Sequence, residues 1–321
     1  MPPATPDGSP SSLPSGPSSG FVDETLAFLP LLLATEIRRR QLSFPLADCR
    51  AILRRGGHIG SALIHHAFLP RAMAEARRLI VMAEDNGQVI ASGFLVIADR
   101  LSASQGRFHR LWHAPPGGLW GCLSLANTML SASRALLPLA VGVAAAETVQ
   151  MFASASVSLR WVNDVLLRGR KMAGFLIESF FTPRYREEFD LIGLAFNLNN
   201  RNFPAELRAS ATSLAADLGQ EISLPYFLAV FLVKLRWNIG LLLHEEERLL
   251  AAERAGGHRL LAAWRSLSDT LGRRLRYGFD VLANPQYEAV ALDIDEDGGL
   301  ILEHADGWRR TEYSGEVRYL D

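Results

Sequence analysis

Arg160-Trp161-Val162-Asn163-Asp164, followed by Gly169-Arg170-Lys171-Met172-Ala173-Gly174, is the stretch that decides the predicted fold. Residues 157–161 and 171–178 are rich in apolar and β-compatible side chains, and the segment 168–170 between them supplies a turn. We therefore predict a hairpin in which Lys171 begins a largely buried strand. That strand would hold the Lys171 ammonium near the Asn163/Asp164 pair, while Gly174 leaves room for a ligand beside the backbone. The pattern suits a site for an acid and a nucleotide.

These segments, with others in the same order along the chain, resemble the biotin protein ligases. That family has a Lys-Trp-Pro-Asn-Asp segment and then a Lys-x-x-Gly strand ending in Glu, matched here by Arg160–Asp164, Lys171–Gly174 and Glu178. Further matches are Pro115-Pro116-Gly117-Gly118-Leu119-Trp120, Ile192-Gly193-Leu194-Ala195-Phe196-Asn197-Leu198-Asn199 and Ala211-Thr212-Ser213-Leu214. Several such strings in order are far more specific than any one of them. The resemblance runs from about Leu69 to the C-terminus.

The resemblance implies an α+β fold. A mixed β-sheet with packed helices, the class II synthetase-like catalytic domain, is expected over residues 67–262, and a small SH3-like barrel over residues 263–321. The sequence pattern agrees with it. Helices are expected over 70–86, 138–151, 211–218 and 224–247, and strands over 94–98, 119–125, 191–198, 274–282, 289–293, 300–303 and 316–319.

The resemblance also implies the chemistry. Such ligases join biotin, a carboxylic acid, to the α-phosphate of ATP and then pass the acyl group to a lysine of a biotin carboxyl carrier domain. By their places in the matched motifs, Lys171 is the predicted catalytic cation and Asp164 the predicted ligand of the Mg²⁺ that accompanies the phosphates. Asn163, Gly174 and Asn197 are the predicted substrate-binding residues. A homodimer is one expected assembly.

The segment Leu101–Trp112 departs from the family's pattern. Biotin ligases carry Gln-x-x-Gly-Arg-Gly-Arg-x-Gly-Arg-x-Trp here, a loop that folds over the adenylate. The residues kept, and predicted to bind the adenylate, are Gly106, Arg107, Arg110 and Trp112. The family's leading glutamine, first glycine, first arginine and third glycine are replaced by Leu101, Ser104, Gln105 and His109. Fewer glycines restrict the backbone, but two arginines still suit phosphate oxygens.

A second departure concerns recognition of the acid. Arg71 and Ala72 stand where the family has a serine and a threonine that help to hold biotin, and Leu101 replaces a glutamine. Polar ligand atoms left unpaired in a buried pocket cost roughly 1–3 kcal/mol each. The sequence therefore predicts weak biotin binding or a preference for a more apolar acid.

Two alternatives remain open. One is a ligase or transferase for lipoate or another acid, although the chain lacks the Arg-Arg-x-Ser-Gly-Gly-Gly string of lipoate ligases. The other is a homologue without turnover that binds an adenylate or a carrier domain. The 101–112 loop separates them, because a working ligase must sequester its reactive intermediate.

The N-terminal part lies outside the resemblance. Residues 1–20 are dominated by Pro, Ser and Gly and are predicted to be disordered. Residues 21–66 form an extension of unknown role, in which 24–38 is predicted to be an amphipathic helix interrupted by Pro30. Because this piece is short and shows no convincing pair of helices, we predict no DNA-binding domain.

Composition fits a cytoplasmic enzyme. The chain has 321 residues, 49% of them hydrophobic, and a net charge of −1, so no overall charge favours nucleic acid. Cys49 and Cys122 are the only cysteines, which argues against a disulfide-stapled secreted protein. The apolar run over residues 135–146 is too short to span a bilayer, so no membrane contact is expected.

Overall fold

The structure is a computed structural model that describes residues 19–153, 155–251 and 258–320. The predicted disordered segment 1–20 therefore lies outside the described residues, except for Ser19 and Gly20, which begin the first helix. The helices and strands are α1 Ser19–Arg40, α2 Leu46–Arg55, β1 Leu63–His66, α3 Ala72–Asp85, β2 Phe94–Ala98, β3 Leu119–Ala126, α4 Ser131–Ala135, α5 Leu137–Gln150, β4 Val157–Arg160, β5 Asp164–Leu167, β6 Arg170–Phe181, β7 Glu188–Phe196, α6 Leu214–Leu218, α7 Leu224–Leu250, α8 Arg259–Leu267, β8 Arg274–Gly278, β9 Tyr287–Ile294, β10 Leu300–Glu303, β11 Arg309–Glu312 and β12 Glu316–Tyr319.

A seven-stranded mixed sheet carries the larger part of the fold, in the order β1-β2-β3-β7-β6-β5-β4. The β1–β2 pair is parallel and the remaining pairs are antiparallel. The expected hairpin around the turn at 168–170 is present, but its first arm is β5 rather than residues 157–161. Residues 157–160 form β4, which pairs with the other side of β5.

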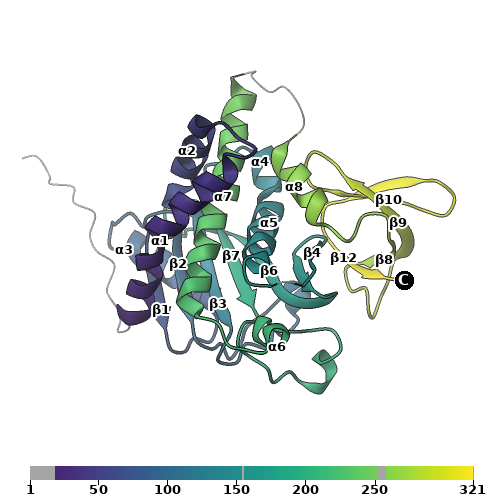
Figure 1. The fold of residues 1–321 in the computed structure, drawn as a ribbon, viewed down its shortest axis with the longest axis horizontal. Coiled ribbons are helices and arrows are strands. Elements are labelled where there is room, and N and C mark those ends of the chain that lie inside the picture. The colour runs from purple at the N-terminus through teal and green to yellow at the C-terminus, as the bar shows by residue number, and fades with distance from the viewer. Residues whose placement is uncertain (1–18, 154, 252–257, 321) are drawn as a thin grey trace, which may run out of the picture.

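Helices cover both faces of this sheet. On one face α1, α5 and α7 pack over the strands around a large apolar core, as Figure 1 shows with α7 running from the top of the view downward. On the other face α3 packs on β2, β3 and β7 around a smaller core. Because α3 covers only part of its face, the rest is free to form a cavity.

Helix α7 is long and apolar enough to cross a membrane by length and composition alone. However, 83% of its most apolar stretch is buried inside the fold. The packing against α1, α2 and α5 accounts for that burial. The apolar surface of α7 therefore forms part of the hydrophobic core of the fold.

The N-terminal segment is built into the sheet domain. Helix α1 runs through Pro30 without interruption, unlike the expected break, and a second helix, α2, follows it. Both helices pack on α7, and β1 completes the edge of the sheet by pairing with β2. Residues 21–66 thus contain a helix pair that the sequence did not reveal, but the pair covers α7.

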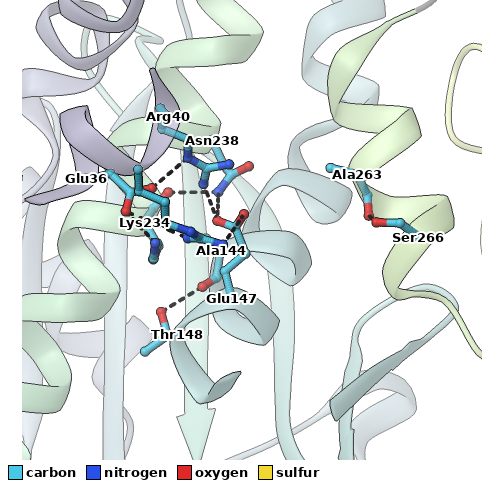
Figure 2. Close-up of polar contacts among 10 residues, drawn as sticks. Glu36, Arg40, Ala144, Glu147, Thr148, Lys234, Asn238, Ala263 and Ser266 are labelled. Carbon is cyan, nitrogen blue, oxygen red and sulfur yellow. Dashed lines mark hydrogen bonds and ion pairs between the residues drawn. The ribbon is translucent and has the colours of Figure 1, made fainter. Parts of the chain in front are cut away.

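A network of buried charged side chains joins α1 to α5 and α7 (Figure 2). The Lys234 ammonium lies 2.5 Å from Glu36 Oε2, and Arg40 contacts Glu36 Oε1 at 2.7 Å and Glu147 Oε2 at 2.5 Å. Asn238 also donates to Glu147 Oε2, over 3.2 Å. Each of these acidic groups has a cationic partner, so the network compensates for the burial of its charges.

The C-terminal part is a five-stranded antiparallel sheet, ordered β11-β10-β9-β8-β12. It confirms the predicted small SH3-like domain, with β11 as a strand that the sequence did not indicate. It packs beside α8 and β4, as seen at the right of Figure 1. Trp161 fixes this contact, since its indole donates to the Gly298 carbonyl and its backbone N–H to Thr270 Oγ1.

Candidate active site

The part of the sheet face that α3 leaves uncovered forms the floor of a cavity of about 760 Å³. The floor includes three small residues, Gly174 on β6 and Gly193 and Ala195 on β7. They lie close together, since Gly174 pairs with Ala195 and Gly193 pairs with Leu176. A Cβ at Gly174 would lie 3.0 Å from Lys171 Cε and 3.1 Å from the Trp112 ring. Glycine is therefore needed here for a close approach to the floor.

The Lys171 ammonium is fixed on the wall of this cavity. Its Nζ lies 2.6 Å from Asp164 Oδ1 and 4.9 Å from the centre of the Trp112 ring. The second oxygen of Asp164 accepts hydrogen bonds from Arg160, at 2.6 Å from the terminal nitrogen and 3.2 Å from Nε. One carboxylate thus holds two cations beside an open space.

This arrangement keeps Asp164 ionised. Burial acts to raise the pKa of the Asp164 carboxyl, but the charges and hydrogen bonds of Lys171 and Arg160 outweigh it, and the pKa is lowered. Burial lowers the pKa of the Arg107 guanidinium. The negative charges of Glu316 and Asp164 act in the opposite direction and partly offset that effect. The site therefore concentrates cations around one carboxylate.

The backbone of Lys171 is held from a segment distant in sequence. Its N–H donates to the Ser210 carbonyl over 2.8 Å, and its carbonyl accepts from Thr212 N–H over 3.0 Å. Residues 203–211 also line the cavity on this side. The motif at 211–214 thus clamps the strand that carries Lys171, and Ser213 caps α6 by accepting from Ala216 N–H.

The segment 101–112 is folded into a small hairpin at the cavity mouth. Ser104 Oγ donates to the Trp112 carbonyl over 2.6 Å, and Gly106 N–H donates to the Arg110 carbonyl over 2.8 Å. Phe108 has a φ of 55°, in the left-handed region. The segment is therefore a closed hairpin held by its own backbone and by Ser104.

The same hairpin leans on the C-terminal domain. Arg107 donates to the Gly315 carbonyl over 2.7 Å, and Arg110 bridges Glu316 and Asp280 at 2.7 and 2.8 Å. Glu316, Val281, Leu282 and Arg318 complete the cavity wall from that domain. The C-terminal domain therefore contributes directly to the site.

All nine site residues predicted from sequence line this one cavity: Gly106, Arg107, Arg110, Trp112, Asn163, Asp164, Lys171, Gly174 and Asn197. Asn163 and Asn197 are engaged within the protein: Asn163 Nδ2 donates to the Phe175 carbonyl, and Asn197 Oδ1 accepts from Asn200. Their roles toward a ligand stay predictions.

The sequence missed two groups of residues. Arg160 was quoted only as part of the matched segment 160–164 and was given no role, although it contacts Asp164 on the oxygen opposite Lys171. The C-terminal residues 281–282 and 316–318 gave no signal, because they reach the cavity through domain packing.

The described residues do not fit a protein-built metal site. Among residues 19–153, 155–251 and 258–320, no group of three or more His, Cys, Asp or Glu side chains could hold a metal ion. Both oxygens of Asp164 already face cations. The prediction of Asp164 as a Mg²⁺ ligand stays a prediction, and its geometry favours the holding of Lys171.

Comparison with known proteins adds sequence and fold relationships. Residues 77–197 match the model of the biotin/lipoate A/B protein ligase family, and residues 281–318 match the biotin protein ligase C-terminal domain. The chain is 30% identical over 227 residues to the biotin--[acetyl-CoA-carboxylase] ligase of Mycobacterium tuberculosis, a match that covers 66% of this chain and 73% of that protein. It is 29% identical over 262 residues to the bifunctional ligase/repressor BirA of Bacillus subtilis, covering 81% and 74% respectively.

Among solved structures, the biotin protein ligase from Aquifex aeolicus in complex with biotin and ATP is similar in fold. The TM-score is 0.62 at 21% identity, over 80% of this chain and 97% of that one. The mixed sheet, the packed helices and the small C-terminal barrel predicted from sequence are thereby confirmed.

Proposed function

The chain belongs to the biotin/lipoate A/B protein ligase family, and we propose on that premise that it is an ATP-dependent biotin protein ligase. One observation carries the proposal. The Lys171 ammonium, held 2.6 Å from Asp164, stands on the wall of a cavity of about 760 Å³. Ligand sites commonly span roughly 300–1,000 Å³, so this cavity has room for an acid beside a nucleotide.

In the first step a carboxylate oxygen of biotin attacks the α-phosphorus of ATP. A new oxygen–phosphorus bond forms, pyrophosphate leaves with the electrons of the broken bond, and biotinyl-AMP results. Two anions must meet, so a cation that is already in place lowers their repulsion without reorganising in the reaction. Lys171 supplies that cation, while Asp164 and the strand contacts at 210–212 hold it in position.

In the second step an uncharged lysine amine of a biotin carboxyl carrier domain attacks the acyl carbon. The new amide forms, AMP leaves, and the amine loses a proton. The intermediate must be shielded from water until the acceptor arrives. The hairpin at 101–112, braced on Glu316 and Asp280, covers the cavity mouth and suits that task.

We propose that Mg²⁺ reaches this site on the ATP phosphates. The described side chains offer no cluster that would hold it alone, and Asp164 is occupied by Lys171 and Arg160. Mg²⁺ is commonly bound through substrate phosphates with one or two carboxylates at most. No step above depends on a protein-bound ion.

Mass spectrometry tests the proposal. The protein is incubated with biotin, ATP and Mg²⁺, with and without a biotin carboxyl carrier domain, and lipoate replaces biotin in a parallel sample. We expect biotinyl-AMP without the carrier and a biotinylated carrier with it. Adenylation of lipoate alone would assign the chain to another acid, and no adenylate with either acid would favour a homologue without turnover.

A further inference from the structure

Helix α1 lies over α7 at the outside of the fold (Figure 1). Its inner face is buried, with Thr25, Leu29 and Glu36 at 0%, 6% and 4% exposed. On its outer face Leu31 is 67% exposed. The outer face of a helix on a globular protein is usually charged or polar. An outer face centred on an exposed leucine therefore suggests a surface that meets a partner.

The outer face of α1 follows a seven-residue repeat. Seven residues advance an α-helix by nearly two full turns, so Glu24, Leu31 and Arg38 lie along one line. Ala27 and Ala34 form a second line beside it, each three residues further along the helix. The outer stripe consists of Glu24, Ala27, Leu31, Ala34, Thr35 and Arg38, all of them exposed. This spacing is typical of helices that pair along their length.

The two ends of the outer stripe carry opposite charges. Glu24 and Arg38 lie seven residues before and seven residues after Leu31. The Glu24 carboxylate accepts a long hydrogen bond of 3.5 Å from Ser223 Oγ. Within the part of the chain that the structure describes, Arg38 has no ion-pair partner. Both charges are therefore available to a partner whose own charges are arranged in the opposite order.

We propose that the outer stripe is a self-association surface, on which α1 of a second copy of this chain packs in antiparallel orientation about a twofold axis at Leu31. In a twofold dimer each contact occurs twice, so Glu24 of one copy meets Arg38 of the other at both ends. Leu31 meets its counterpart at the centre. The small side chains of Ala27 and Ala34 let the two helices approach closely.

Charge complementarity selects this occupant. An antiparallel second copy pairs both charges, whereas a parallel copy would place Glu24 against Glu24 and Arg38 against Arg38. An anionic membrane surface would attract Arg38 but repel Glu24. Helix α1 also lies outside residues 77–197 and 281–318, which match the family models. The surface is therefore a property of this chain's own N-terminal segment.

The length of the stripe sets the strength of the dimer. Glu24 and Arg38 are 14 residues apart in the helix, about 21 Å at roughly 1.5 Å per residue. A helix pair of that length buries less than the roughly 1,200 Å² of a standard interface, so we expect a weak dimer with a Kd of about 10–100 µM. No residue of α1 lines the cavity, so association leaves the candidate active site open.

Charge reversal tests the antiparallel pairing. Arg38→Glu makes both ends of the stripe negative and Glu24→Arg makes both positive, so each variant alone repels its own copy. An equimolar mixture of the two variants restores opposite charges across the interface. Sedimentation equilibrium over about 5–500 µM would give the Kd of each sample. Arg50→Glu, which reverses an exposed arginine on α2, is the matched control.

We expect each single reversal to weaken association by about tenfold or more, and the mixture and the double variant to recover it to within about threefold of wild type. Leu31→Asp, at the centre, should weaken it by about thirtyfold or more. Arg50→Glu should change the Kd by less than about threefold. Adenylate formation by every variant should stay within about threefold of wild type, which also shows that each variant folds.

Cross-linking gives the orientation independently. The native Cys49 and Cys122 are buried, so an added surface cysteine reports on the stripe alone. With oxidised glutathione, Leu31→Cys should form a disulfide-linked dimer, because the two cysteines face each other at the axis. Glu24→Cys should not, because an antiparallel pairing places it about 21 Å from its counterpart.

A wild type that remains monomeric at about 500 µM would overturn the inference. So would a single charge reversal that leaves the Kd unchanged, a mixture that fails to recover association, or a Glu24→Cys variant that cross-links as readily as Leu31→Cys. Association that persists in Leu31→Asp would place the interface elsewhere on the chain and would overturn it as well.

Discussion

Two clusters of charged side chains lie inside this molecule and differ in what surrounds them. In the helix cluster, Glu36, Arg40, Glu147 and Lys234 are enclosed by α1, α5 and α7, and the Lys234 side chain is 3% exposed (Figure 2). In the cavity cluster, Arg160, Asp164 and Lys171 stand on an open wall, and the Lys171 side chain is 30% exposed. The two ammonium groups lie at similar distances from their carboxylates, 2.5 Å for Lys234 and Glu36 and 2.6 Å for Lys171 and Asp164.

The difference teaches what makes a buried ion pair functional. The positive charge of Lys234 is compensated within the protein, because Glu36 contacts the ammonium directly and Glu147 adds a second negative charge nearby. Lys171 keeps part of its ammonium free toward a cavity that can admit phosphates. Enclosure makes the first cluster structural, and access makes the second a candidate for catalysis.

The largest expected effect is on stability, from Lys234→Met. Removing one partner of a buried pair leaves Glu36 charged and less compensated, so the free energy of unfolding should fall by about 3–5 kcal/mol. Urea unfolding measures the change, and Lys234→Met combined with Glu36→Leu, which removes both charges, is the control that should recover part of it. A loss below about 1 kcal/mol in the single variant would break the contrast between the clusters.

The next largest effect is on the reaction, from Lys171→Met. Deleting the ammonium while keeping most of the stem should slow single-turnover adenylate formation by about a hundredfold or more, roughly 3 kcal/mol of transition-state stabilisation. Quenched-flow mass spectrometry at saturating ATP gives the rate. Formation within about threefold of wild type would remove Lys171 from the chemistry.

A smaller effect is expected from Asp164→Asn. The amide keeps the shape but weakens the hold on Lys171 and Arg160, so exchange should fall by about tenfold, near 1.4 kcal/mol. The Mg²⁺ concentration that gives half-maximal exchange should stay unchanged. A rise of tenfold or more in that concentration would instead identify Asp164 as a metal ligand.

The smallest effect concerns pH. The pKa of Glu36 is lowered, because Arg40 and Lys234 outweigh the opposing effect of burial. Its contribution to stability is therefore fully present above the ordinary value of 4.5 and is lost as pH falls through the lowered pKa. Unfolding measured from pH 7 to pH 3 should show this loss more steeply in wild type than in Lys234→Met, and identical curves would show that Lys234 does not set the Glu36 pKa.

The cavity cluster was more predictable than the helix cluster. Lys171, Asp164 and Gly174 lie in short motifs whose order along the chain could be matched. By contrast, Glu36 is polar yet 4% exposed, so α1 does not show a clean polar face, and Pro30 suggested a break that the helix does not have. A rule based on amphipathic spacing does not recognise a helix whose buried face carries charged residues.

Other features depended on contacts that are distant in sequence. Strand β1 contains two histidines and pairs with β2, whose residues lie about thirty positions later, so no local pattern announced it. Strand β5 was missed because only residues 157–161 were taken as the first arm of the hairpin, whereas β5 begins three residues after β4 ends and forms that arm. Arg71 looked like a loss of polar recognition until its bonds to Gln105 and Glu178 placed it at the cavity.

The most direct test of the account is biotin-dependent exchange of labelled pyrophosphate into ATP, measured in parallel for wild type, Lys171→Met and Lys234→Met and expressed per folded molecule. We predict exchange only when biotin and ATP are both present, about a hundredfold less in Lys171→Met, and within about threefold of wild type in Lys234→Met. No exchange by wild type, or an equal loss in the two lysine variants, would contradict the account.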